Sequence, residues 1–136
     1  MDLDRALTIS ASGMTAQSSR LRVVAENLAN QDSTGTAPGA DPYRRKTVTF
    51  ERHVDRATGA ESLRPGRVGT APGEFPAHYE PNHPAADERG YVRTPNVDSL
   101  IEVMDMREAQ RSYSANLSVL ETTRGMLQRA IDSLRA

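Results

Sequence analysis

The sequence predicts a mainly α protein, in which helices at the two ends of the chain pair as a coiled coil around a Pro/Gly-rich middle segment. Two observations support this fold class. All eight prolines, all three histidines and seven of the nine glycines lie between Gln31 and Pro95. The two ends contain no proline, and they hold all five methionines and most of the leucine, isoleucine and valine. Because proline and glycine interrupt helices, the ends are predicted to be helical and the middle is not.

The composition limits the size of the core and the class of partner. A chain of 136 residues suits one domain, but only 24 residues are Leu, Ile, Val or Phe, so the core must be thin. A net charge of −1 gives no field that would attract nucleic acid or an anionic membrane. There is no cysteine, and no apolar run approaches the ~20 residues that cross a bilayer. We therefore expect no membrane insertion and no cleaved signal peptide.

The first predicted element is a helix within residues 1–30, about 40 Å long at ~1.5 Å per residue. Its apolar residues recur in alternating steps of three and four, the spacing of a coiled coil, with Ser10 and Gln17 as the polar exceptions. The apolar positions of this predicted assembly seam are Leu3, Leu7, Met14, Leu21, Val24 and Leu28.

A second helix is predicted within residues 96–136, with Asn96 or Asp98 as its cap and Ser99-x-x-Glu102 as a capping box. Its seam positions are Val103, Met106, Tyr113, Leu117, Leu120, Leu127, Ile131 and Leu134, with polar Gln110 and Arg124 between them. This helix is longer than the first, so pairing within one chain leaves the flanks of both half-exposed. We expect neighbouring subunits to cover them.

The middle segment, residues 31–95, divides into a strand, a loop and an arm. Residues 43–54 alternate between apolar and polar and predict a strand, followed by a turn at 55–59. Residues 61–73 are rich in Gly, Pro and Arg, so a mobile loop is expected over about 55–77. Residues 75–97 predict an extended, proline-locked arm with tyrosine anchors and a turn at Gly90. The middle thus contains a short β hairpin or strands and an extended arm.

Two groups of residues offer alternative chemistries. His78, Glu80, His83 and Asp87 carry metal-ligand atoms, but nothing in their spacing brings them together, and surface-loop residues are the simpler interpretation. The run 44–46 is basic, but in a chain of near-zero net charge it is better explained as a solvated or interface face than as a phosphate site. No nucleophile or phosphate-loop motif is present, so we predict no enzyme activity, no cofactor and no metal.

Several motifs resemble a known family. The run from Ile9 to Gln17, then Asn27-Leu-Ala-Asn30 and Ser33-Thr34, is similar to the amino-terminal signature of bacterial flagellar rod and hook proteins. Later motifs resemble the proximal rod branch of that family. The matching positions are Asn27, Asn30, Tyr43, Arg44, Arg45, Pro81, His83, Pro84, Gly90, Tyr91, Pro95, Asn96, Val97, Arg111, Tyr113 and Asn116. Asn82 replaces an expected glycine and Arg124 an expected lysine, and Asn82 tolerates a left-handed backbone.

The resemblance implies an axial-protein core domain and a structural role in the flagellar basal body. It implies a subunit of the periplasmic rod, a helical tube that transmits torque and encloses the export channel. The implied partners are copies of this chain, other proximal and distal rod proteins, the rod-to-ring adaptor and the flagellar type III export apparatus. Export would need no cleaved signal peptide. The alternatives are another axial protein of the rod and hook superfamily, a generic coiled-coil adaptor, or a small metal-dependent enzyme.

Overall fold

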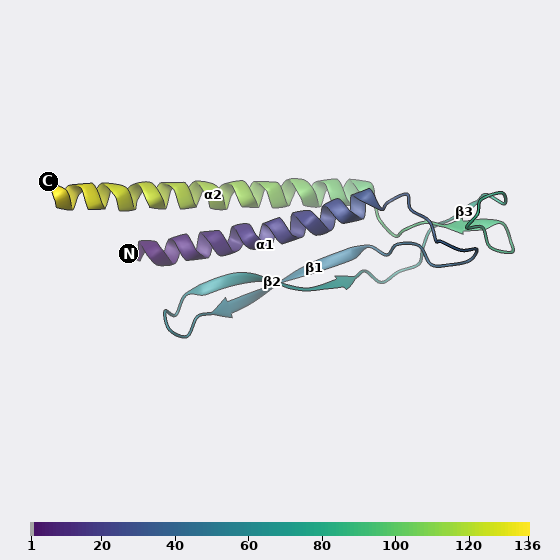
Figure 1. The fold of residues 1–136 in the computed structure, drawn as a ribbon, viewed down its shortest axis with the longest axis horizontal. Coiled ribbons are helices and arrows are strands. Elements are labelled where there is room, and N and C mark those ends of the chain that lie inside the picture. Colours follow the sequence, from purple (N-terminus) through teal and green to yellow (C-terminus); the bar gives the residue numbers. More distant parts are fainter. Residues whose placement is uncertain (1) are drawn as a thin grey trace. The chain divides into compact units, whose positions relative to one another are not determined.

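The computed structural model describes residues 2–136 and contains two long helices, with two small sheets formed by the part of the chain that connects them (Figure 1). The elements in chain order are α1 (Leu3–Ala29), β1 (Lys46–Val54), β2 (Glu61–Thr70), β3 (Ala77–Tyr79), β4 (Tyr91–Arg93) and α2 (Ser99–Arg135). The prediction of a helix at each end and a hairpin in the middle is confirmed. Within residues 2–136 no helix has an apolar stretch long enough for a bilayer.

The chain divides into two compact units, and both helices contribute to each. The first unit consists of residues up to Leu21, Thr49–Arg67 and Arg107–Ala136. The second consists of Arg22–Val48 and Val68–Met106. Each unit is described separately below.

Both helices begin at a capped turn. Asp2 accepts a hydrogen bond from the backbone N–H of Arg5 at 3.1 Å, and α1 begins at the next residue. Asp98 accepts a hydrogen bond from the N–H of Leu100 at 3.0 Å, so Asp98 is the N-cap of α2. Of the two predicted caps, Asn96 and Asp98, the second is therefore confirmed. The predicted capping box is not formed, because the Glu102 carboxylate accepts hydrogen bonds from Arg45 and Asn27 instead.

The helices run antiparallel in the first unit, where two pairs of facing positions lie seven residues apart on each helix. In the first unit, a Cβ on Gly13 would lie 2.9 Å from the amide nitrogen of Asn116. Seven residues away along each helix, Ala6 and Thr123 line one hollow. In the second unit, Asn27 hydrogen-bonds Glu102, fourteen residues from Gly13 and Asn116. These positions are spaced along each helix by multiples of seven residues.

Strands β1 and β2 form a two-stranded hairpin. The predicted turn is confirmed: the N–H of Asp55 donates to the carbonyl of Ala60 at 2.9 Å, and Gly59 has a φ of 64°. The expectation of a loop over residues 61–70 was wrong, because this segment is β2. The Gly- and Arg-rich sequence of this segment does not favour a strand. Pairing with β1 stabilises the strand by supplying hydrogen bonds to its backbone.

The outer edge of β2 is closed where it meets α1 in the first unit. The N–H of Leu63 donates to the Ser12 hydroxyl at 3.1 Å, so it points away from β1. Pro65, two residues on, lies on the same edge and has no N–H. Leu63 and Pro65, two successive residues on the edge that faces away from β1, therefore have no free N–H donor.

The predicted arm is extended at its ends but doubles back on itself. Strands β3 and β4 pair antiparallel, with Tyr79 opposite Tyr91 and their rings edge-to-face at 5.4 Å between centroids. Gly90 allows the return, since its φ is 83° and a Cβ there would come within 2.9 Å of the Tyr79 ring.

Candidate functional site

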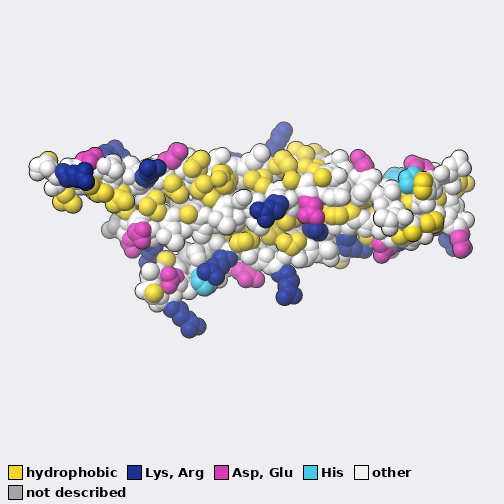
Figure 2. All heavy atoms as spheres, in the orientation of Figure 1, with side chains coloured by type: hydrophobic (Ala, Val, Ile, Leu, Met, Phe, Trp, Pro, Cys, Tyr) yellow, Lys and Arg dark blue, Asp and Glu magenta, His cyan; other side chains and the backbone are white. Residues whose placement is uncertain are grey.

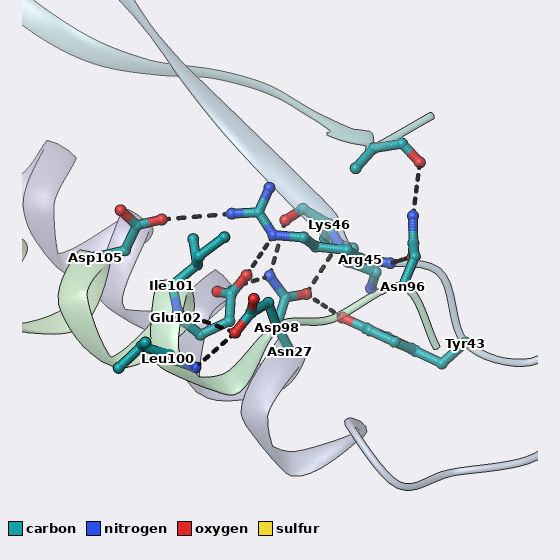
Figure 3. Close-up of polar contacts among 11 residues, drawn as sticks. Asn27, Tyr43, Arg45, Lys46, Asn96, Asp98, Leu100, Ile101, Glu102 and Asp105 are labelled. Carbon is teal, nitrogen blue, oxygen red and sulfur yellow. Dashed lines mark hydrogen bonds and ion pairs between the residues drawn. The ribbon is translucent and has the colours of Figure 1, made fainter. Parts of the chain in front are cut away.

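A polar cluster in the second unit centres on Asn27, whose side chain is 1% exposed (Figure 3). Its amide nitrogen donates to the carbonyl of Lys46 at 2.9 Å and to a carboxylate oxygen of Glu102 at 3.2 Å. Its amide oxygen accepts from the N–H of Lys46 at 2.9 Å and from the Tyr43 hydroxyl at 2.7 Å. Both donors and both acceptor sites are used, so this one side chain joins α1, β1 and α2.

Glu102, on the first turns of α2, is fully buried and shares its carboxylate between two partners. One oxygen accepts a hydrogen bond from Asn27 and the other accepts one from Nε of Arg45. The Arg45 guanidinium also contacts Asp105 at 3.4 Å. A carboxylate removed from water in this way needs both the charge and the hydrogen bonds of its partners.

Tyr43 lies at the margin of the cluster. Partial burial and then the negative charges of Glu26 and Glu102 raise the pKa of its phenol to about 12. Lys46 meets the Glu26 carboxylate at 2.5 Å, and both side chains are partly exposed. Tyr43 therefore stays protonated and donates to Asn27 at physiological pH.

Asn96 and Arg44, which lie next to the cluster, connect the segment after β2 to it. Asn96 accepts from the backbone N–H of Arg45 at 2.8 Å and donates to the carbonyl of Ala71 at 3.2 Å. Arg44 donates to the carbonyls of Ala71 and Gly73, and its guanidinium lies 4.3 Å from the centre of the Phe75 ring. The predicted basic run is thus occupied by contacts within the chain.

The remaining family-motif positions of the second unit lie in the β3–β4 turn and beside the helix ends. His83 Nδ1 accepts from the N–H of Ala85 at 3.0 Å, and Pro81 packs beside Gly90. Tyr91 and Pro84 are exposed, Pro95 is buried, and Val97 is half-buried. Asn30 donates to the carbonyl of Glu26 at 2.9 Å in the last turn of α1. These positions shape the chain's turns and ends.

The alternative metal set does not converge. Among residues 2–136, no group of three or more His, Cys, Asp or Glu side chains is placed to hold a metal ion. Asp87 instead accepts the N–H groups of Tyr91 and Arg89, which lower the pKa of its carboxyl. Within the same described range no non-glycine residue has a positive φ, so Asn82 does not use the left-handed backbone suggested for it.

In the first unit, Tyr113 and Asn116 face α1 and Arg111 is exposed. Tyr113 and Leu120 of α2 line an open hollow of about 260 Å³ with Ala11, Met14 and Thr15 of α1. A second hollow, of about 410 Å³, is lined mostly by apolar side chains that include Leu3, Val119 and Met126. The surface between the helices is therefore incompletely filled.

The predicted seam positions differ in exposure between the helices. On α1, Val24 is buried and the other five are half-buried. On α2, Met106, Tyr113 and Leu120 are half-buried, whereas five others are exposed: Val103, Leu117, Leu127, Ile131 and Leu134. Figure 2 shows apolar side chains at the surface over the helices. Whether these side chains form an assembly seam stays a prediction.

The residues that α2 buries most fully were not among the predicted seam positions. They are Glu102, Ala109 and Thr123, and half-buried Asn116 completes a series spaced by seven. Apolar periodicity cannot find this series because its members are small or polar. Its seven-residue spacing is the signal that identifies it.

Comparison with protein-family models gives two matches, one at each end of the chain. Residues 7–35 match the model described as flagella basal body rod protein. Residues 88–133 match the model described as flagellar basal body rod FlgEFG protein C-terminal. The matches contain Asn27 and Glu102, the two buried centres of the polar cluster.

Individual relatives match nearly the whole chain. A flagellar basal-body rod protein FlgC from Agrobacterium fabrum is 52% identical over 134 residues, 98% of this chain and 96% of its own length. FlgC from Escherichia coli O6:H1 is 42% identical, covering 90% of this chain and 91% of its own, and FlgC from Bacillus subtilis is 33% identical, covering 93% and 94%. The chain therefore belongs to the flagellar basal-body rod protein family, as a FlgC-like member.

Proposed function

We propose that this chain is a structural subunit of the proximal rod of the bacterial flagellum. It assembles with copies of itself and with other rod proteins into a helical tube that transmits torque and encloses the export channel. The observation that carries the proposal is 52% identity to a FlgC protein across 98% of the chain.

The helix surfaces support an assembly role. Five of the eight apolar seam positions of α2 are exposed in the single chain. Exposed apolar rows of this kind are typical of protein contacts, and burying them contributes about 25 cal/mol per Å². In the proposed assembly α1 and α2 pair as a coiled coil within a subunit, and their outer faces pack on neighbours. No catalytic role is proposed.

The proposed location is the periplasmic part of the basal body. The chain reaches it through the flagellar type III export apparatus, without cleavage of a signal peptide. The rod-to-ring adaptor and the distal rod proteins are the proposed neighbours, and neither nucleic acid nor the membrane interior is a partner.

A deletion strain tests this proposal. Cells that lack the gene should make no complete rod and should not swim, and a copy of the gene should restore both properties. Basal bodies purified from the restored cells should contain the full-length chain, detected by mass spectrometry. Swimming cells with complete rods in the absence of the gene would contradict the proposal.

A further inference from the structure

We propose that Met126 is a site of reversible oxidation, at which a peroxide converts the thioether to a sulfoxide and thereby loosens the first turn of α1 from α2. The chain has no cysteine, so methionine supplies its only sulfur. Four methionines lie on the two long helices within residues 2–136: Met14, Met104, Met106 and Met126. Met126 combines access to solvent with an apolar contact between the helices.

Access to solvent separates the four thioethers into two pairs. The Met104 and Met126 side chains are 62% and 46% exposed, whereas Met14 and Met106 are half-buried. A peroxide has to reach the sulfur atom before it can oxidise it, so susceptibility follows exposure. We therefore expect the single chain to be oxidised first at Met104 and Met126.

Met126 also has an apolar contact to lose. In the first unit it lines a hollow of about 410 Å³ together with Leu3 and Ala6 of α1 and Val119 of α2. Because α1 begins at Leu3, this hollow lies where the first turn of α1 meets α2. A flexible thioether suits such an irregular apolar space.

Oxidation adds one oxygen atom to the sulfur. A sulfur lone pair attacks one oxygen of hydrogen peroxide, an S–O bond forms as the O–O bond breaks, and the second oxygen leaves as water after proton transfer. The sulfur loses two electrons and the peroxide gains them. The product is a polar, chiral sulfoxide. Placing it against apolar side chains without a hydrogen bond is unfavourable.

The hydroxyl groups around the hollow do not hold a sulfoxide inside it. The Thr123 hydroxyl already donates to the carbonyl of Val119 at 2.7 Å. Ser118 and Thr122 are exposed, so a sulfoxide that bonds to either of them lies toward water. Oxidised Met126 therefore turns out of the hollow, and Leu3 loses its apolar neighbour.

The order of oxidation is the first test. The purified full-length chain is treated with limiting hydrogen peroxide, and peptide mass spectrometry locates each added oxygen atom. Met104 and Met126 should be converted before Met14 and Met106, and in urea all four should react alike because the fold no longer limits access. The same order in buffer and in urea, or a Met126 that reacts no faster than Met14, would overturn the proposal.

The effect on α1 is tested with M126L and M104L, since leucine keeps the apolar volume of methionine and contains no sulfur. The readout is amide exchange over residues 6–12, because the Ala6 N–H, which bonds the Asp2 carbonyl, begins the helical hydrogen bonds of α1. After oxidation, the unmodified chain and M104L should lose protection there, whereas M126L should keep it. Most of the Met104 side chain is already in water, so its sulfoxide should change little.

Reduction of the sulfoxide completes the test. Methionine sulfoxide reductases A and B each reduce one epimer, and together with a thiol reductant they should restore both the thioether and the protection of α1. An equal loss in M126L and the unmodified chain, or no loss once Met126 is fully oxidised, would overturn the proposal. So would a thioether restored without protection, or residues 6–12 that are unprotected before oxidation, because Met126 would then not hold α1 in place.

Discussion

Glu102 shows how one buried charge organises a small fold. Its carboxylate has no exposed surface, and its desolvation is offset by Arg45 and by the amide of Asn27. A buried ion pair of this kind adds little net stability, but removal of one partner leaves the other charge without compensation. The Glu102–Arg45 pair therefore contributes more to the specific arrangement of three segments than to the net stability of the fold.

Glu102→Ala should lower the free energy of unfolding of the second unit by about 3 kcal/mol, because the Arg45 guanidinium and Asn27 lose their shared acceptor. Glu108→Ala is the matched control on the same helix, since Glu108 pairs with Arg20 at 3.4 Å but its side chain is 68% exposed. That change should cost less than about 1 kcal/mol. Urea unfolding followed by circular dichroism measures both. Equal losses for the two variants would show that Glu102 is not specially buried.

Tyr43 gives a pH-dependent prediction. Its pKa is raised from 10.0 to about 12, so the folded state holds the phenol proton more tightly than the unfolded state. The resulting stability is complete below pH 10 and is lost as the pH rises toward 12. Subtracting the 295 nm titration of Tyr43→Phe from that of the unmodified chain should give a transition close to pH 12. A transition near the ordinary pKa of 10.0 would place Tyr43 in water.

At the scale of the elements, apolar spacing predicted both helices, but it did not identify every residue between them. On α2 the buried series, Glu102, Ala109 and Thr123, lies one position before the predicted Val103, Gln110 and Arg124. Small and polar side chains allow close approach there, and the larger apolar ones flank the contact. The apolar spacing of the sequence identifies the flanking positions, because these positions carry the large apolar side chains.

The strand β2 could not be predicted because its stabilising contacts are distant in sequence. Its residues lack apolar alternation and include Pro65 and two glycines. It forms a strand because β1 is opposite and because Ser12 accepts the N–H of Leu63. The polar cluster was missed for the same reason: Glu102 suggested a local capping role, and its true partners lie 57 and 75 residues away.

The two helix glycines predict opposite responses to one substitution. Gly13→Leu should destabilise the helix pair, because even a Cβ there would lie 2.9 Å from the Asn116 side chain. Gly125→Leu should stabilise α2 by up to about 1 kcal/mol, the helix propensity difference, because a Cβ there meets nothing closer than 3.9 Å. Helix content and thermal unfolding, followed by circular dichroism, measure both effects. A stabilised Gly13→Leu variant would mean that the helices do not approach closely there.

At the scale of the whole molecule, the predicted seam can be tested in cells. Leu7→Asp and Leu120→Asp each place a carboxylate on a half-buried apolar position, where desolvation without a partner costs about 2 kcal/mol or more. In a helical assembly this cost recurs at every subunit. Cells that carry either variant should export the chain, fail to complete the rod, and not swim.

Glu61→Ala is the control for these variants, since Glu61 is exposed on β2 and its ion pair with Arg52 is long, at 3.8 Å. Swimming should be unaffected by this change. The level of each variant in the periplasm must be measured together with motility, because failed secretion would also stop swimming. Normal rods with Leu120→Asp at wild-type abundance would show that this position is not part of a buried assembly seam.

The isolated chain should be monomeric or weakly associated at micromolar concentration, with incompletely ordered helices. Exposed seam positions on α2 lack the burial that would hold the helix in place without neighbours. Amide exchange should therefore be fast over the last turns of α2, and analytical ultracentrifugation should establish the mass. Strong protection throughout residues 3–28 and 100–134 in a proven monomer would contradict this prediction.

The closed edge of β2 has a consequence for solubility. A free strand edge is a template on which further chains stack into cross-β aggregates, and the hazard grows when subunits accumulate at high local concentration. Here the Ser12 hydroxyl occupies the N–H of Leu63, and Pro65 offers no donor at the next outward position. Ser12→Ala with Pro65→Val would reopen that edge, and the chain would gain a route to fibrils that compete with ordered polymerisation.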